Sequence, residues 1–182
     1  KEKDEKIELL RKFGKDSGLF ENIRTTAYGD NNLAPFELVV EKDGSEYSIS
    51  SVGYGVSQIL PIVVDMIFAS EPMILIQQPE VHLHPKAQAA FGEFLFNISH
   101  YDSNRKFIIE THSDYIIDRY RYCLKESSDK KENFGRIFFM MHKDGHNKVQ
   151  VIPFNSEGGY ESDDLVEYRK FFIDESLKVM EC

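Results

Sequence analysis

Two short apolar segments constrain the fold of this chain more than any other feature of its sequence. Residues 73–76 (MILI) and 106–110 (KFIIE) have the pattern of buried strands, and each precedes a segment with helical periodicity, at about 85–98 and 113–124. Strands that alternate with helices are typical of a parallel sheet, because the helix returns the chain to start the next strand in the same direction. The sequence therefore predicts an α/β fold with a parallel sheet flanked by helices.

The remaining helices are predicted from apolar residues at helical spacing. EKIELLRKFG predicts an amphipathic helix that ends at Gly14, and SQILPIVVDMIFAS a buried helix that begins close to Ser57, so that Pro61 falls in its first turn. Residues 163–180 predict a last amphipathic helix. Residues 125–135 have no periodicity and are expected to form a loop.

Two antiparallel strand pairs are expected outside the parallel sheet. Near the N-terminus, a β-hairpin joins an apolar strand at residues 36–40 to a return strand at 47–49 through Asp-Gly at 43–44. Near the C-terminus, residues 135–141 and 148–154 flank HKDGHN in the same way.

Composition limits the compartment and the partners of the chain. No apolar run reaches the roughly 18 residues of a membrane span, and the charged start KEKDEKIELL is unlike a signal peptide, so we expect a cytoplasmic protein without a membrane partner. Cys123 and Cys182 cannot build a disulfide framework and are expected to be free thiols. The formal charge of -9 argues against non-specific coating of nucleic acid. A length of 182 residues suffices for a single domain.

Polar residues follow both predicted parallel strands, where open α/β sheets bind their ligands. Gln77 and Gln78 end the first strand. Glu110 ends the second, and His112 and Ser113 come after it, with Ser113 placed to cap the next helix. An imidazole at this position can donate a hydrogen bond to a phosphoryl oxygen. The same amides and histidine can equally serve as structural partners of the backbone.

Two further segments contain candidate binding residues. Gly53 and Gly55 lie directly before a predicted helix, where the backbone can approach a phosphate, although an isolated pair of this kind is more often a plain tight turn. His82 and His84 alternate in HLHP, but a zinc site needs at least one further ligand, and neither a cysteine nor a positioned carboxylate supplies it. A loop is therefore the favoured interpretation of HLHP.

The order of these segments resembles the C-terminal half of an ABC-class ATPase head, in the RecF, SMC and OLD-like branch of the AAA-family ATPases. A subgroup of that branch has a Walker B segment similar to IEQPELHLHPKAQA, preceded by GxGxSQxLP. The corresponding segments here are IQQPEVHLHPKAQA and GYGVSQILP. The resemblance covers roughly residues 17–118, including SGLFENI, and implies an ABC-ATPase-like fold that uses ATP and Mg²⁺.

The resemblance also implies a role for the glycine segment. SVGYGVSQ matches the signature that reaches across a head-to-head dimer to the γ-phosphate of the nucleotide held by the other subunit. Gly53, Gly55, Ser57 and Gln58 are its candidate nucleotide-binding residues. Gly53 stands where the family usually has serine.

Four residues of the later motifs take roles from the same resemblance. Gln77 falls at the magnesium position of Walker B, and Gln78 at the position that orients the attacking water. His84 belongs to the segment in place of the D-loop and is a candidate nucleotide-binding residue, and His112 takes the place of the switch histidine. Glu80 is the nearest carboxylate and could take over water or metal contacts, although an exposed loop acid is the favoured interpretation.

The sequence departs from the family pattern in two further ways. Gln77 lacks the carboxylate that Mg²⁺ prefers, and these 182 residues contain no GxxxxGK[ST] phosphate loop. We therefore expect residues 1–182 to be the C-terminal lobe of a head that needs a Walker A lobe, on a separate chain or on a missing segment.

Two functions from different classes fit this description. The first is an ATP-binding and hydrolysing protein of DNA repair or anti-phage defence. The second is a non-hydrolysing, nucleotide-gated scaffold that docks DNA or a nuclease. A toprim-type nuclease fits less well, because ESDD at residues 161–164 follows no convincing strand.

We expect the 182-residue chain by itself to bind Mg-ATP weakly or not at all, because it contains no phosphate loop whose backbone nest and lysine grip the phosphates. Isothermal titration calorimetry on the purified chain measures this directly. Binding with a micromolar dissociation constant would contradict the expectation.

Overall fold

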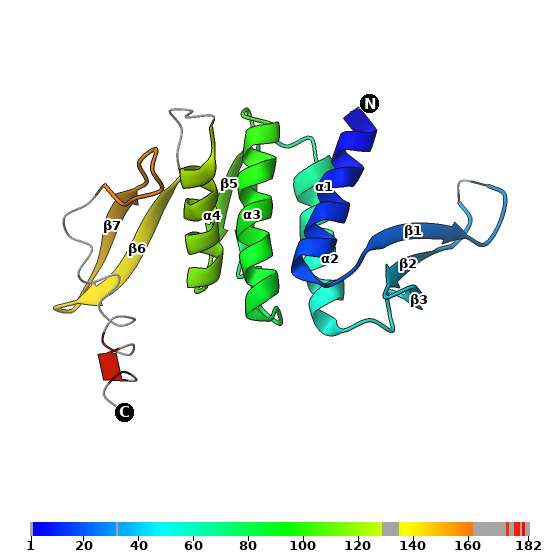
Figure 1. Cartoon of the computed structure of the whole chain (residues 1–182), viewed down its shortest axis with the longest axis horizontal. Helices are drawn as coiled ribbons and strands as arrows, with labels where there is room; N and C mark the ends of the chain where they lie inside the picture. The colour runs from blue at the N-terminus through cyan, green and yellow to red at the C-terminus, as the bar shows by residue number, and fades with distance from the viewer. Residues whose placement is uncertain are drawn as a thin grey trace. The chain divides into compact units, whose positions relative to one another are not determined.

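The computed structural model describes residues 2–31, 33–128 and 135–161, together with 174, 177, 178 and 180. These residues belong to two compact units, 1–120 and 121–182, which are described separately (Figure 1). The assignment of a single domain stays a prediction. Apart from those four positions, the helix predicted over 163–180 lies outside the described residues, as does Cys182.

Helix α1 (Glu2–Ser17) continues past Gly14, where the sequence pattern predicted its end. Gly14 lies inside the helix, and the ring of Phe20 packs against it. A Cβ at Gly14 would lie 2.3 Å from two atoms of that ring, so the position needs a glycine for packing. The chain leaves the helix at Gly18, whose φ of +70° is readily adopted by glycine. The predicted end was wrong because this glycine serves packing rather than termination.

An aromatic cluster joins α1 to helix α3 (Pro85–Tyr101). The ring centroids of Phe13 and Phe94 are 5.5 Å apart, and Phe20 and Phe91 pack against Phe13 at 6.2 and 6.4 Å. Separations of this size are typical of favourable edge-to-face aromatic pairs. The same core includes buried residues of helix α2 (Tyr54–Phe68): Val56, Ile59, Leu60, Val63, Met66 and Ile67.

Glu93 of α3 adds a polar link across the helices. Its carboxylate accepts hydrogen bonds from Lys12 of α1 and, at 3.1 Å, from Arg119 of α4 (Asp114–Glu126). The hydrogen bond from Lys12 is the main reason that the pKa of Glu93 is lowered from its ordinary value. The charged form of Glu93 therefore helps to hold α1 and α4 on α3.

Helix α2 (Tyr54–Phe68) begins earlier than predicted, with Gly53 as its N-cap residue. Gly55 and Ser57 therefore lie within the helix, and Pro61 lies beyond the first turn. The expected start close to Ser57 was wrong, because it was chosen to keep the proline in the first turn. Pro61 is exposed, so its ring lies on the solvent-facing side of the helix.

Three antiparallel strands form a sheet in the order β1-β2-β3: β1 (Asn22–Ala27), β2 (Phe36–Lys42) and β3 (Ser45–Ser48). The predicted hairpin of β2 and β3 is confirmed by the pairing of Lys42 with Ser45. Strand β1 was not predicted, because NIRTTA has no clear apolar alternation. It is positioned by its pairing with β2, from Asn22 opposite Glu41 onward.

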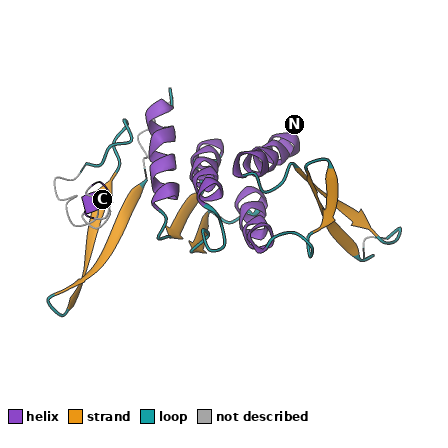
Figure 2. Ribbon diagram, turned by 60° about the horizontal axis from the view of Figure 1, so that its bottom comes forward, coloured by secondary structure: helices purple, strands orange, loops and turns teal. Residues whose placement is uncertain are grey.

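Strands β4 (Met73–Gln77) and β5 (Lys106–Glu110) pair in parallel, as predicted. Helix α3 connects them and extends to Tyr101, beyond the predicted end at about residue 98. Ile76 belongs to the core and Ile109 packs against it, and Figure 2 shows helices on one side of this strand pair.

The second unit contains the predicted C-terminal strand pair. β6 (Arg136–Lys143) and β7 (His146–Pro153) are antiparallel and meet at Asp144-Gly145, where both residues have positive φ. Arg121, also of this unit, lies 3.7 Å from the ring centroid of Tyr160 and donates a hydrogen bond to the carbonyl of Gly158 at 2.7 Å. Within the described residues, no helix is long and apolar enough to cross a membrane.

Gly92→Ala tests the packing of α3 against α4. A Cβ at Gly92 would lie 2.3 Å from the carbonyl oxygen of Ile116, so we expect a loss of about 1–3 kcal/mol in the free energy of unfolding, even though alanine favours helix. Urea denaturation measures the change. Lys86→Ala, at an exposed position of the same helix, is the control and should stay within about 0.5 kcal/mol. Equal effects of the two substitutions would contradict the packing.

Candidate functional site at the ends of the parallel strands

The parallel register brings the ends of β4 and β5 to the same edge of the sheet, with Gln77 opposite Glu110. The next residue, Gln78, donates its backbone N–H to the carbonyl of Glu110 at 2.8 Å. Its side-chain Nε2 lies 3.3 Å from Oε1 of Glu110. Main chain and side chain of Gln78 are therefore both held beside the end of β5.

A tight turn follows β4 directly. Gln78 has φ +46° and His82 φ +68°, both in the left-handed region that non-glycine residues rarely adopt. The turn is closed by hydrogen bonds from Val81 N–H to the carbonyl of Gln78 at 3.2 Å and from Leu83 N–H to the carbonyl of Glu80 at 2.9 Å. Strained backbone of this kind persists only where surrounding contacts hold it, which is frequent at ligand sites.

Glu80 points from this turn toward the end of β5. Its Oε1 accepts a hydrogen bond from the backbone N–H of His112 at 2.6 Å. Its Oε2 is buried and has no hydrogen-bond partner in the part of the chain that the structure describes. The expectation of an exposed loop acid was wrong, because the backbone of a segment distant in sequence draws the carboxylate inward.

Ser113 forms a second link between the two segments. Its hydroxyl accepts from the N–H of Ile116 at 3.3 Å, which confirms it as the N-cap of α4, and donates to Oε1 of Gln88 at 2.6 Å. The amide of Gln88 in turn donates to the carbonyl of Leu83 at 2.7 Å. The sequence analysis missed Gln88, whose only signal is a single amide among the alanines that open α3.

The start of α2 packs against the same turn. A Cβ at Gly55 would lie 2.8 Å from the carbonyl oxygen of His82, and the rings of Tyr54 and His82 meet edge to face with centroids 4.6 Å apart. A Cβ at Gly53 would meet no atom within 4 Å. The two glycines of the segment therefore differ: Gly55 permits a close approach of backbones, whereas Gly53 faces open space.

Several other candidate residues have exposed side chains. Gln77, Gln58 and His84 are exposed, and His84 is the N-cap residue of α3. The hydroxyl of Ser57 donates to the carbonyl of Tyr54 at 2.9 Å, within its own helix. Gly55, Gln78, Glu80 and His112 thus contact residues of neighbouring segments, whereas these other candidates are exposed or bonded locally.

The described residues offer few side chains that could bind a metal ion together. Among the described residues, no group of three or more His, Cys, Asp or Glu side chains could hold a metal ion. The left-handed backbone of His82 also means that HLHP is not the extended segment in which alternate imidazoles point the same way.

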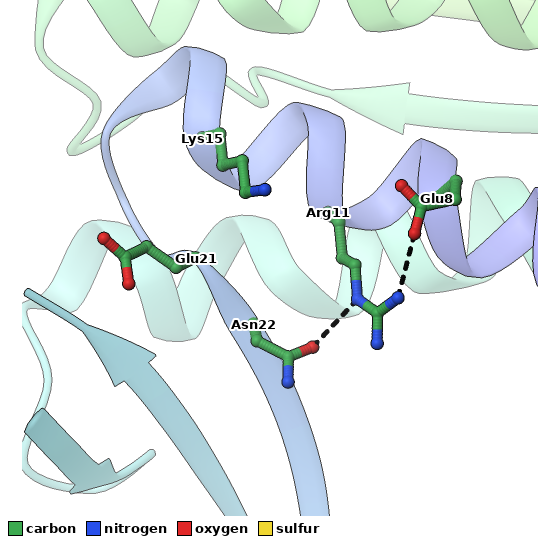
Figure 3. Close-up of a pocket in the computed structure, with 5 residues that line it drawn as sticks. All are labelled: Glu8, Arg11, Lys15, Glu21 and Asn22. Atoms are coloured by element: carbon green, nitrogen blue, oxygen red, sulfur yellow. Dashed lines mark hydrogen bonds and ion pairs between the residues drawn. The ribbon is translucent and has the colours of Figure 1, made fainter. Parts of the chain in front are cut away.

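A pocket elsewhere in the first unit contains none of the candidate residues. It is open and lies between α1 and the start of β1, lined by Glu8, Arg11, Lys15, Glu21 and Asn22 (Figure 3). Arg11 donates hydrogen bonds to Glu8 at 2.8 Å and to Asn22 at 3.1 Å, so its guanidinium is already engaged (Figure 3).

Comparison with protein families gives a match over residues 2–118 to the family described as "AAA domain, putative AbiEii toxin, Type IV TA system". That range includes every candidate site residue. No curated protein sequence matches the chain.

Solved structures of SMC ATPase heads have a similar fold. A chain from a study of ATP-driven dimerization and DNA-stimulated activation of SMC ATPases superposes with a TM-score of 0.52 at 13% identity, covering 83% of this chain and 89% of that chain. The SmcHead bound to the C-winged helix domain of ScpA gives 0.58 at 15% identity, covering 82% and 43%.

The Smc head from Pyrococcus furiosus, with an extended coiled coil and bound to the C-terminal domain of ScpA, gives a TM-score of 0.56 at 13% identity and covers 95% and 37%. The chain therefore spans less than half the length of these last two heads. The likeness shows the predicted ABC-ATPase-like fold.

The two glycines of the signature-like segment should respond differently to alanine. Gly55→Ala is expected to lower the free energy of unfolding by about 1–3 kcal/mol, because the methyl group would press on the carbonyl of His82. Gly53→Ala is the matched control and should cost less than about 1 kcal/mol, the effect of a poorer N-cap. Chemical denaturation of both variants checks this, and a Gly55→Ala variant as stable as the wild type would contradict the close approach.

Proposed function

The chain belongs to the AAA-domain family described as putative AbiEii toxin of a type IV TA system, and we propose that the edge of the sheet where β4 and β5 end is one half of an ATP-hydrolysing site. Its fold is that of an ABC-class, SMC-like ATPase head. One observation carries the proposal: the hydrogen bonds of Gln78 with Glu110 and of Glu80 with His112 bring the Walker B-like and switch-like segments to a single edge.

The residues at this edge fit Mg-ATP in part. Mg²⁺ prefers carboxylate and water oxygens, and the register supplies one exposed carboxylate, Glu110, beside the exposed amide of Gln77. Such a donor set suits an ion that keeps most of its water shell. When bound, Mg-ATP supplies the phosphoryl group and the metal charge that balances it.

Gln78 and His112 have complementary roles in this proposal. The amide of Gln78 both donates and accepts hydrogen bonds, so it can orient a water molecule, but it cannot take the proton as a carboxylate would. The exposed imidazole of His112 can donate a hydrogen bond to a phosphoryl oxygen. Gln78 would act by positioning and His112 by hydrogen bonding to developing charge, and positioning together with charge compensation accounts for most of the catalysis of phosphoryl transfer.

The start of α2 serves a second copy of the chain in this proposal. In a head-to-head dimer, Gly53, Gly55, Ser57 and Gln58 would contact the nucleotide of the opposite subunit, with His84 beside them. A helix N-terminus with unpaired N–H groups favours phosphate. The head that this requires is completed by a lobe with a phosphate loop, since GxxxxGK[ST] is absent from these 182 residues.

The proposed setting is DNA repair or anti-phage defence in the cytoplasm. One similar SMC structure comes from work on ATP-driven dimerization and DNA-stimulated activation, so DNA is the partner to test first. A nuclease is the second.

A non-hydrolysing scaffold is the alternative that two observations favour. Gln77 lacks the magnesium-preferring carboxylate, and Gly53 lacks the hydroxyl that the signature usually offers. A head with both changes could close on a nucleotide and dock DNA or a nuclease without turnover.

His112→Ala tests the hydrolytic proposal. We expect ATP turnover to fall at least about 100-fold in a complex completed by a phosphate-loop lobe and carrying Gln77→Glu, because the proposed donor to the phosphoryl oxygen is lost. Steady-state ATPase assays and thermal melting, run together, separate this loss from a loss of stability.

The matched control is His142→Ala, on β6, which should leave turnover unchanged. Turnover that survives His112→Ala would refute the assigned role. Failure of Gln77→Glu to restore turnover in the completed complex would favour the scaffold.

A further inference from the structure

The carboxylate of Glu80 connects the turn after β4 to the backbone of the segment after β5. We propose that Glu80 is a positioning residue: it sets the place of His112 through the backbone N–H of that residue, and is neither the acid or base nor a metal ligand. The catalytic meaning of this inference rests on the proposed function. The link itself is a property of the folded chain.

The hydrogen bond is short and directional. Oε1 of Glu80 lies 2.6 Å from the backbone nitrogen of His112, slightly shorter than the roughly 2.7–2.9 Å of charge-assisted N–H···O bonds. His112 lies two residues after Glu110, the last residue of β5, so its N–H lies beyond the β4–β5 ladder. Glu80 supplies the acceptor that the sheet does not.

The backbone of Glu80 is itself fixed. Leu83 N–H donates to its carbonyl at 2.9 Å, and Gln78 N–H ties the start of the turn to the carbonyl of Glu110 at 2.8 Å. Pro79, directly before Glu80, is buried and has a restricted φ. The carboxylate therefore extends from a rigid support, and the two segments are joined at more than one point.

His112 is also anchored on its C-terminal side. Ser113 is buried, and its hydroxyl bonds to Gln88 at 2.6 Å while capping α4. The backbone of His112 is thus held from both directions, whereas its side chain is exposed. A fixed backbone with an open side chain suits a group that must meet a ligand at a defined place.

The orientation of Glu80 argues against a chemical role. One carboxylate oxygen is occupied by His112 N–H, and the other is buried from solvent. An acid, a base or a metal ligand would need an oxygen directed toward the open edge, where Gln77 and the His112 side chain are exposed. Glu80 instead faces the backbone.

Three substitutions at Glu80 distinguish the two roles. Glu80→Gln keeps an acceptor oxygen at the same distance from the backbone but removes the charge. Glu80→Asp keeps the charge but shortens the side chain by one methylene. Glu80→Ala removes the acceptor. A positioning role predicts that glutamine substitutes well and that aspartate and alanine do not, whereas an acid, a base or a metal ligand requires the carboxylate and tolerates glutamine as poorly as alanine.

The first measurement uses the 182-residue chain alone. Amide hydrogen exchange followed by NMR should show His112 exchanging at least about tenfold faster in Glu80→Ala and Glu80→Asp than in the wild type, and within about fivefold of it in Glu80→Gln. The amide of Ile76, in the core strand β4, is the reference that corrects for global stability. Equal exchange in all four proteins, or a glutamine variant that behaves like alanine, would overturn the inference.

The second measurement uses the completed ATPase with Gln77→Glu. Glu80→Ala and Glu80→Asp should lower kcat at least tenfold with KM unchanged, and Glu80→Gln should retain kcat within about fivefold. A glutamine variant that loses kcat while its His112 amide stays protected would overturn the inference, because Glu80 would then act chemically. If the completed complex with Gln77→Glu and an unchanged Glu80 shows no turnover, the proposed function fails by itself, and amide exchange alone decides whether Glu80 positions the backbone of His112.

Discussion

The parallel pairing of β4 with β5 is the interaction on which the candidate site depends. Because both strands run in the same direction, their carboxyl ends reach one edge of the sheet, and the register places Gln77 opposite Glu110. An antiparallel pair would send the two polar ends to opposite edges. Helix α3 makes this pairing possible, since it returns the chain between the strands and packs its apolar face on them.

Close approaches of backbone at two glycines determine where the neighbouring helices lie. Gly92 of α3 faces the carbonyl of Ile116 in α4, and Gly55 of α2 faces the carbonyl of His82. A side chain at either position would separate the elements. The first contact sets α4, whose N-cap follows His112 directly, and the second sets α2 against the turn after β4. The edge is therefore positioned by backbone packing as much as by its hydrogen bonds.

Both carboxylates at this edge accept hydrogen bonds from other residues of the edge. Glu80 accepts from the backbone N–H of His112, and Glu110 accepts from the side-chain amide of Gln78, while Gln77 and Gln78 are neutral. On the proposed function, this half of the head contributes position more than charge. The compensation of phosphate charge then falls to the bound metal and to the lobe with the phosphate loop.

Local pattern was sufficient for the elements whose form depends on their own residues. Strands β4 and β5, the hairpins and the cap at Ser113 were predicted because alternation, turn residues and capping chemistry act over a few positions. The helix through Gly14, the packing of Gly55 and the inward carboxylate of Glu80 were not, because each depends on a contact made only in the folded chain. The candidate site divides in the same way. The sequence by itself determined which polar residues follow the two strands, and only the tertiary structure decided that Glu80 would hold the backbone of His112, since a hydrogen bond between distant segments exists only once packing has brought them together.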